Sequence, residues 1–161
     1  SEGLALAFNV AAMLIAFIAL VSLLDASLGG LTGLTGLGRV TFQDVAGRAF
    51  VPFAWLMGTP WEDCGFVGML LGQKMVLNEF VAYGTLADSL AAGREVSERA
   101  VLISTYALSG FANFGSIGIL IGGMGSLAPE RRGDIASVGL VAMIGGTVAT
   151  FMTACFAGLL R

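Results

Sequence analysis

Three polar side chains in otherwise apolar segments are the residues of this chain whose types could bind a polar ligand. Glu79 lies between two apolar stretches, and Asn113 and Ser116 follow the helix-breaking pair Ser109-Gly110 in another. Polar groups are costly inside a membrane-spanning segment, and glycine lets the backbone open where they lie. A carboxylate can accept two hydrogen bonds from a polar ligand, and Asn113 and Ser116 are spaced to share one helix face. An interrupted helix of this kind is typical of a substrate site in a secondary transporter.

Structural roles are open alternatives for the same residues. Glu79 could pair with Lys74, although five residues place the two on different faces of a continuous helix. Asn113 and Ser116 could make ordinary interhelical hydrogen bonds. For Gln73 and Lys74 we favour capping of broken backbone ends over ligand contact.

The composition indicates an integral membrane protein. Of the 161 residues, 57% are hydrophobic and 12% are charged, about half the charged fraction of a soluble domain. The net charge of -3 and the lack of a basic run argue against a nucleic-acid partner. Histidine is absent, and Cys64 and Cys155 lack metal-site spacing, so we predict no metal site in this chain.

The first part of the chain predicts one spanning helix followed by a surface helix. Residues 4–24 are apolar and long enough to cross a bilayer. Residues 28–38 hold five glycines and predict a loop or a re-entrant connection. Thr41 and Asp44 form a variant capping box, which opens an aromatic-rich helix to about Met57. We expect this helix to lie along the membrane interface.

The rest of the chain predicts a hairpin, an interrupted helix and a final span. A strong helix start at 59–63 precedes two apolar arms that are each too short to cross a bilayer, with polar residues near their junction. Such a re-entrant hairpin needs a covering of protein or a water-filled cavity. Ser97 caps the next helix, which breaks at Ser109-Gly110, and residues 135–160 form the last span. Arg131 and Arg132 place the preceding turn on the cytoplasmic side.

We therefore predict an all-α integral membrane fold, with spanning helices plus an interfacial helix, a re-entrant helical hairpin and a broken transmembrane helix. Its predicted parts are a scaffold transmembrane helix (1–27), a loop and interfacial helix (28–58), the re-entrant hairpin (59–96), and the broken helix with the final transmembrane helix (97–161). Residue 1 is not Met and leads directly into an apolar helix. We expect an N-terminal half to be missing from this sequence.

Three segments, in order and spacing, resemble the C-terminal part of the concentrative nucleoside transporter family. They are residues 52–60 (PFAWLMGTP), 71–83 (LGQKMVLNEFVAY) and 106–132 (YALSGFANFGSIGILIGGMGSLAPERR). The resemblance covers nearly the whole chain. It implies a homotrimer that imports nucleosides across the cell (inner or plasma) membrane, using a sodium or proton gradient, as a multi-pass protein.

The resemblance also implies roles for individual residues. Glu79, in Asn78-Glu79-Phe80, matches a glutamate that contacts ribose hydroxyls, and Asn113 and Ser116 match further ribose contacts. Phe111 would face the sugar or the base. Asn78 either supports Glu79 or contacts the substrate directly.

Two departures from the family pattern leave base preference and the coupling ion open. The first half of the pattern, which holds the base-binding hairpin and the sodium site, lies outside this sequence. Many relatives also have cysteine where this chain has Ser109. We therefore expect no cofactor here beyond a coupling sodium ion or proton, with the sodium site in the absent N-terminal half.

The predicted function is the C-terminal, ribose-binding part of an ion-coupled nucleoside symporter. Its expected partners are a nucleoside, the lipid bilayer, two further copies of the chain and the N-terminal half of the transporter. The alternative is a non-transporting membrane assembly or scaffold subunit, or an inactive fragment. A membrane-embedded enzyme is disfavoured, because the chain has no histidine and no G-x-S-x-G motif, and one buried glutamate is a thin basis for acid–base catalysis. We predict no enzyme and no catalytic residue.

Overall fold

The computed structural model describes residues 1–34 and 38–160, which are helical throughout their regular elements. In chain order the helices are α1 (Glu2–Leu34), α2 (Phe42–Leu56), α3 (Trp61–Val76), α4 (Glu79–Ala91), α5 (Glu98–Leu108), α6 (Phe114–Leu127), the short 3-10 helix η1 (Pro129–Arg131) and α7 (Arg132–Leu159). No strand occurs within these two ranges. The all-α prediction is confirmed for the described residues.

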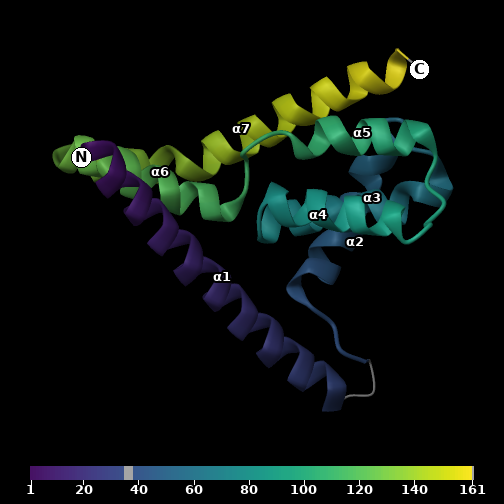
Figure 1. Ribbon diagram of the computed structural model, residues 1–161, viewed down its shortest axis with the longest axis horizontal. Coiled ribbons are helices and arrows are strands. Elements are labelled where there is room, and N and C mark those ends of the chain that lie inside the picture. The colour runs from purple at the N-terminus through teal and green to yellow at the C-terminus, as the bar shows by residue number, and fades with distance from the viewer. Residues whose placement is uncertain (35–37, 161) are drawn as a thin grey trace.

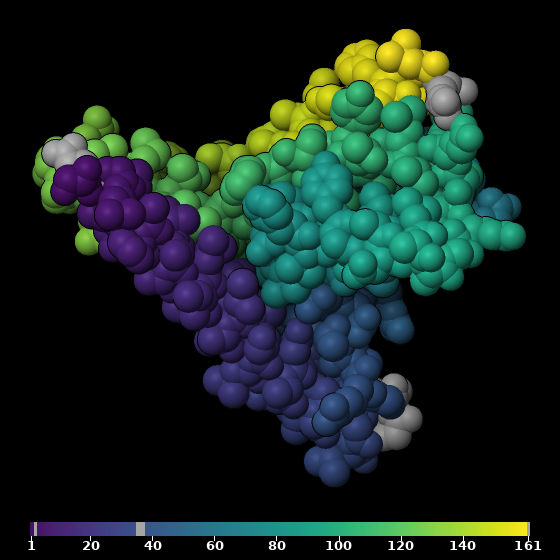
Figure 2. Space-filling model, in the orientation of Figure 1, coloured from purple at the N-terminus to yellow at the C-terminus, as the bar shows by residue number. Residues whose placement is uncertain are grey.

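The helices form a compact group from which two arms extend, one made of α1 and the other of α6 with the start of α7 (Figure 1). Helices α2 to α5 gather on one side, while α7 runs along α5 and α6, and the start of α1 lies beside α6. Helix α1 runs along the edge of the molecule in the space-filling view (Figure 2), and few of its residues are buried. Two helical stretches, Gly3–Leu34 and Pro129–Leu159, are long and apolar enough to cross a bilayer.

The core lies where α3 meets its neighbours. The buried apolar residues of this core come from five helices: Ala54, Met57, Cys64, Phe66, Val67, Leu70, Leu71, Ala82, Leu86, Ala100, Ile103, Ala107, Leu108 and Ala154. Helices α2 and α3 approach most closely at three glycines. A Cβ on Gly68 would lie 2.8 Å from the Gly47 carbonyl oxygen, and one on Gly72 would overlap the Gly47 backbone nitrogen. Gly47, Gly68 and Gly72 therefore permit the close packing of α2 against α3.

Local start signals behave as predicted at α2. The Thr41 hydroxyl accepts from the Asp44 backbone N–H at 3.1 Å, and the Asp44 carboxylate accepts from the Thr41 backbone N–H at 2.8 Å. Both halves of the capping box are therefore formed. Whether α2 lies along a membrane interface stays a prediction.

The predicted loop from residue 28 is wrong for residues 28–34, which continue α1. Within this stretch the Thr32 hydroxyl donates to the Leu28 carbonyl at 2.9 Å and accepts from the Val40 backbone N–H at 3.1 Å. Asp25, earlier on α1, accepts from the Phe42 backbone N–H at 2.7 Å. These contacts with the following segment offset the low helix propensity of glycine. The rest of the predicted loop, residues 35–37, lies outside the described residues.

Candidate functional site

The α3–α4 junction places Glu79 at the first position of a helix. Helix α3 ends at Val76, and Asn78 is the N-cap of α4, with its side-chain oxygen accepting from the Val81 backbone N–H at 3.0 Å. Ser, Thr, Asp and Asn are favoured at this position because they satisfy an unpaired backbone donor. Asn78 therefore fixes the start of α4, and Glu79 follows it with only 5% of its surface exposed.

The α5–α6 interruption places Asn113 in the same way. Helix α5 ends at Leu108 and α6 begins at Phe114, on either side of the predicted break at Ser109-Gly110. Asn113 is the N-cap of α6: its side-chain oxygen accepts from the Ser116 backbone N–H at 2.8 Å and from the Ser116 hydroxyl at 2.9 Å. Both side chains are buried. The Asn113 amide thus satisfies a backbone donor at the start of α6 and orients the Ser116 hydroxyl.

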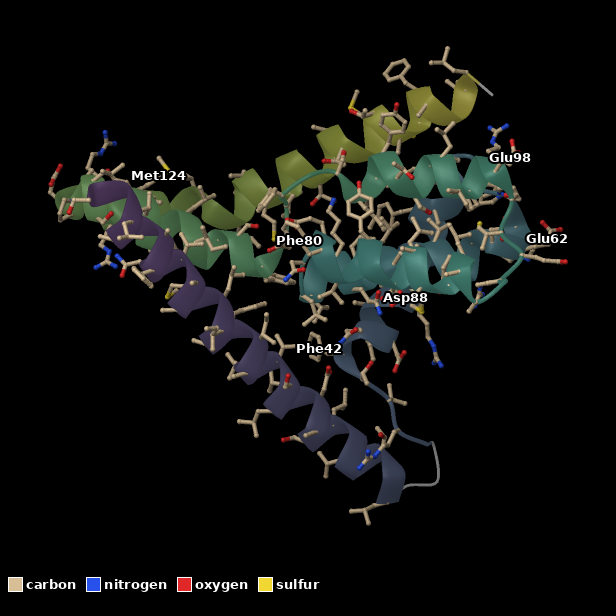
Figure 3. The ribbon with its side chains drawn as sticks, in the orientation of Figure 1. Phe42, Glu62, Phe80, Asp88, Glu98 and Met124 are labelled. Atoms are coloured by element: carbon tan, nitrogen blue, oxygen red, sulfur yellow. The ribbon has the colours of Figure 1, made fainter. Side chains whose placement is uncertain are left out.

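The two helix starts meet through one hydrogen bond. The Asn113 side-chain N–H donates to the Glu79 carboxylate at 3.0 Å, across 34 positions of sequence. A chain of contacts therefore runs from Ser116 through Asn113 to Glu79. The positive ends of the α4 and α6 dipoles both lie at this contact, which favours negative charge there. Phe80, the next residue on α4, is labelled in Figure 3 between α4 and α6.

The end of α5 is also held by side chains of the α3–α4 pair. The Lys74 ammonium, in the last turn of α3, donates to the Ala107 carbonyl at 2.8 Å, and the Tyr83 hydroxyl on α4 donates to the Thr105 carbonyl. These carbonyls lie in the last turn of α5, where no helical donor follows. The backbone-capping role that we favoured for Lys74 is confirmed. The alternative Lys74–Glu79 ion pair is not formed, since Arg131–Asp134 is the ion pair found among the described residues.

The contact between Tyr83 and α5 was not predicted from the sequence. Tyr83 lies four residues after Glu79, and so on the same face of α4. The four-residue spacing could have linked Tyr83 to Glu79, but it did not indicate a hydrogen-bond partner on another helix. The hydroxyl is satisfied by a carbonyl 22 positions away.

A pocket of about 340 Å³ lies next to Asn113, between α6 and α7. It is lined by Gly110, Phe111, Ala112, Asn113, Ser116, Ile117, Leu120, Gly139, Ala142, Met143, Gly146 and Thr150. Phe111 is 65% exposed at this pocket, whereas Glu79 and Asn78 do not line it. The structure thus brings Glu79, Asn113 and Ser116 into one network, and Phe111 lines the pocket together with Asn113 and Ser116.

Gly110 has a steric role beside this pocket. A Cβ at Gly110 would overlap the hydroxyl oxygen of Thr150 on α7. The hydroxyl itself donates to the Gly146 carbonyl at 2.8 Å. The interruption can therefore pass close to α7 only because residue 110 has no side chain. In the described part of the chain, no group of three or more His, Cys, Asp or Glu side chains could hold a metal ion.

Residues 1–158 match the family model described as "Na+ dependent nucleoside transporter C-terminus". The chain belongs to this family. The resemblance drawn from its three sequence segments is therefore confirmed. Because the family consists of transporters and the described residues include two helices of spanning length, the chain is a membrane protein.

Two relatives match almost the entire chain. It is 46% identical over 159 residues to the "Uncharacterized transporter YutK" of Bacillus subtilis, covering 99% of this chain and 39% of YutK. It is 44% identical over 172 residues to mouse "Solute carrier family 28 member 3", covering 99% of this chain and 24% of that protein. Both are described as transporters or carriers, which agrees with the prediction that the chain is not an enzyme. The chain spans less than half the length of each relative.

Solved structures of a transporter named CNTnw share the fold. A variant of CNTnw in the intermediate 2 state aligns with a TM-score of 0.89 and 42% identity, covering 97% of this chain and 39% of that one. CNTnw in an inward-facing substrate-bound state aligns with a TM-score of 0.80 and 43% identity, covering 95% and 37%.

Proposed function

We propose that this chain is the ribose-binding, C-terminal part of an ion-coupled symporter that imports nucleosides. The observation that carries the proposal is the Asn113–Glu79 hydrogen bond, which joins the two helix starts. Polar groups at two helix ends in an apolar protein form the kind of site that secondary transporters use for a polar substrate. The relatives, described as transporters, favour this function over the scaffold alternative.

The chemistry of Glu79 suits the two hydroxyls of a ribose. Asn113 donates to one carboxylate oxygen, which leaves the second oxygen and further lone pairs for hydroxyl donors. The Asn113 amide also holds the carboxylate in one orientation, so the hydrogen bonds to a diol are prearranged. Ser116 and the exposed ring of Phe111 would add a hydroxyl contact and an apolar face toward the sugar or base.

Helix lengths support a re-entrant hairpin and a broken transmembrane helix. Helices α3 and α4 have 16 and 13 residues, or about 24 and 20 Å at 1.5 Å per residue, less than the ~30 Å of a bilayer core. We propose that α3 and α4 enter and leave on one side. Helices α5 and α6, of 11 and 14 residues, are then two halves of one spanning element.

The remaining parts of the proposal follow the family. We place the protein in the cell membrane as a multi-pass homotrimer, with α1 as its scaffold helix. The coupling cation, sodium or proton, binds in the N-terminal half. The family description names sodium, and the gradient that stimulates uptake distinguishes sodium from proton coupling.

Uptake by the complete protein tests the function directly. The protein encoded by the full reading frame is reconstituted into vesicles, and uptake of radiolabelled uridine and adenosine is measured with an inward sodium gradient, an inward proton gradient or neither. We expect saturable uptake of at least one nucleoside that one gradient stimulates. Vesicles that take up neither nucleoside under any gradient, with an assembled protein that also binds neither, would support the scaffold alternative instead.

A further inference from the structure

Lys74 carries a buried charge that the proposed substrate contacts do not use. Its side chain is 1% exposed in the last turn of α3. Lysine is almost never fully buried unless it is paired. Among the described residues no carboxylate lies within ion-pair distance of its ammonium. The Glu79 carboxylate attracts the ammonium from beyond ion-pair distance, and the direct contacts of the ammonium are made by uncharged groups.

The direct contacts of the ammonium are one backbone carbonyl oxygen and one aromatic ring. The Ala107 carbonyl oxygen lies 2.8 Å from the ammonium, and the Phe151 ring centroid lies 5.9 Å from it. A backbone carbonyl oxygen and an aromatic face both attract a monovalent cation.

The ammonium also lies at the C-terminal end of α5, where the helix dipole is negative. Helix α5 stops at the interruption, so its last carbonyls and the negative end of its dipole face the α3–α4 pair. In transporters with interrupted helices, C-terminal ends of half-helices bind the free coupling cation. Here that place is already filled by a side chain of the protein.

We propose that Lys74 is a tethered cation, which occupies the end of α5 where a free monovalent cation would otherwise bind. The ammonium then fixes the position of the interruption that leads to Asn113, and so acts on Glu79 through the α5–α6 connection. Lys74 is a positioning residue and does not touch the substrate. This inference rests on the proposed function, because part of its effect is measured on nucleoside binding.

Chemical rescue of Lys74→Ala in the complete protein tests the tethered cation. Truncation leaves a cavity and an unpaired end of α5, and we expect the Kd for uridine to rise about tenfold, as for loss of a buried charged hydrogen bond. Methylammonium fits the cavity and should restore most of the affinity, whereas tetramethylammonium, which cannot donate a hydrogen bond, should not. Methylammonium should also raise the unfolding temperature of Lys74→Ala without nucleoside, because a bound ligand stabilises the folded state.

Two matched variants separate the charge from ordinary packing. Tyr83→Phe removes the hydrogen bond to the adjacent Thr105 carbonyl without changing any charge, so methylammonium should have no effect on it. Lys74→Met fills most of the cavity and should bind uridine weakly with no rescue. A Lys74→Ala protein with unchanged affinity, or one for which methylammonium changes neither affinity nor unfolding temperature, overturns the inference. Failure of the wild-type protein to bind any nucleoside would instead refute the proposed function.

Discussion

The Asn113 amide donates to the Glu79 carboxylate at 3.0 Å and, through its oxygen, caps the helix that follows it. One side chain therefore couples the start of α6 to the start of α4. On the other side of the interruption, Lys74 and Tyr83 satisfy the last carbonyls of α5. The α3–α4 pair thus contacts both the end of α5 and the start of α6. A displacement of α3 and α4 should therefore move both of these helix ends.

Replacing Glu79 by Gln should abolish high-affinity nucleoside binding. The substitution keeps the side-chain volume but removes the charge and one acceptor, and we expect a loss of about 2–3 kcal/mol, or at least 30-fold in Kd. Calorimetry on the purified complete protein measures this. Glu62→Gln, at an exposed position in the first turn of α3, is the matched control and should bind normally.

Removal of ribose hydroxyls should cost affinity only while Glu79 is present. The wild-type protein is expected to bind a 2′,3′-dideoxynucleoside more weakly than the parent nucleoside, by about tenfold per lost hydroxyl. In Glu79→Gln the affinities for these two nucleosides should differ much less. A thermodynamic cycle over the two proteins and the two ligands gives the coupling energy. Equal discrimination by both proteins would show that another residue reads the sugar.

Substitutions of Asn113 should separate its capping role from its contact with Glu79. Serine is as good an N-cap as asparagine but is too short to reach the carboxylate, whereas alanine has neither function. Asn113→Ala should therefore be about 1 kcal/mol less stable than Asn113→Ser. Both should lose nucleoside affinity to the same extent. Thermal unfolding and calorimetry on the two variants provide the comparison, and a Ser variant with normal affinity would exclude a site role for the amide.

Alanine at Gly72 and at Gly65, both on α3, should have opposite effects on stability. A Cβ at Gly72 meets the backbone of Gly47, which cannot move without separating α2 from α3. We expect a cost of about 1–3 kcal/mol, as for other overpacked sites. At Gly65 a Cβ has nothing within 4 Å, so alanine should stabilise the helix by up to about 1 kcal/mol. Thermal unfolding of the two variants in one detergent tests the pair.

Acid should weaken the start of α2 through Asp44. Hydrogen bonds from the Thr41 backbone N–H and then its hydroxyl hold the pKa of the Asp44 carboxyl below its ordinary value. Because the folded-state pKa is the lower one, this stabilisation is fully present above the unfolded-state pKa and is lost as the pH falls through the folded-state value. The unfolding temperature should therefore fall less steeply below about pH 4 in Asp44→Asn than in the wild type. Identical pH profiles would contradict this role.

Much of this protein could be predicted from local sequence signals. The capping box at Thr41 and Asp44, the start of α3 near Trp61 and the interruption after Leu108 each depend on residues within a few positions, and all are present. Glu79, Asn113 and Ser116 could be singled out for a similar reason, since isolated polar side chains in apolar segments require a partner. Their roles toward a substrate stay predictions.

Only the tertiary structure decided which groups meet. Lys74 bonds to Ala107 and Asn113 to Glu79 across 33 and 34 positions, and no periodicity relates residues so far apart. The helical state of residues 28–34 likewise depends on contacts with the following segment, such as Val40 with Thr32, which outweigh glycine's low helix propensity. Sequence determined which polar groups needed partners, because burial of an unpaired group is costly wherever it occurs. The packing of α3 and α4 against the ends of α5 and α6 determined which groups became those partners.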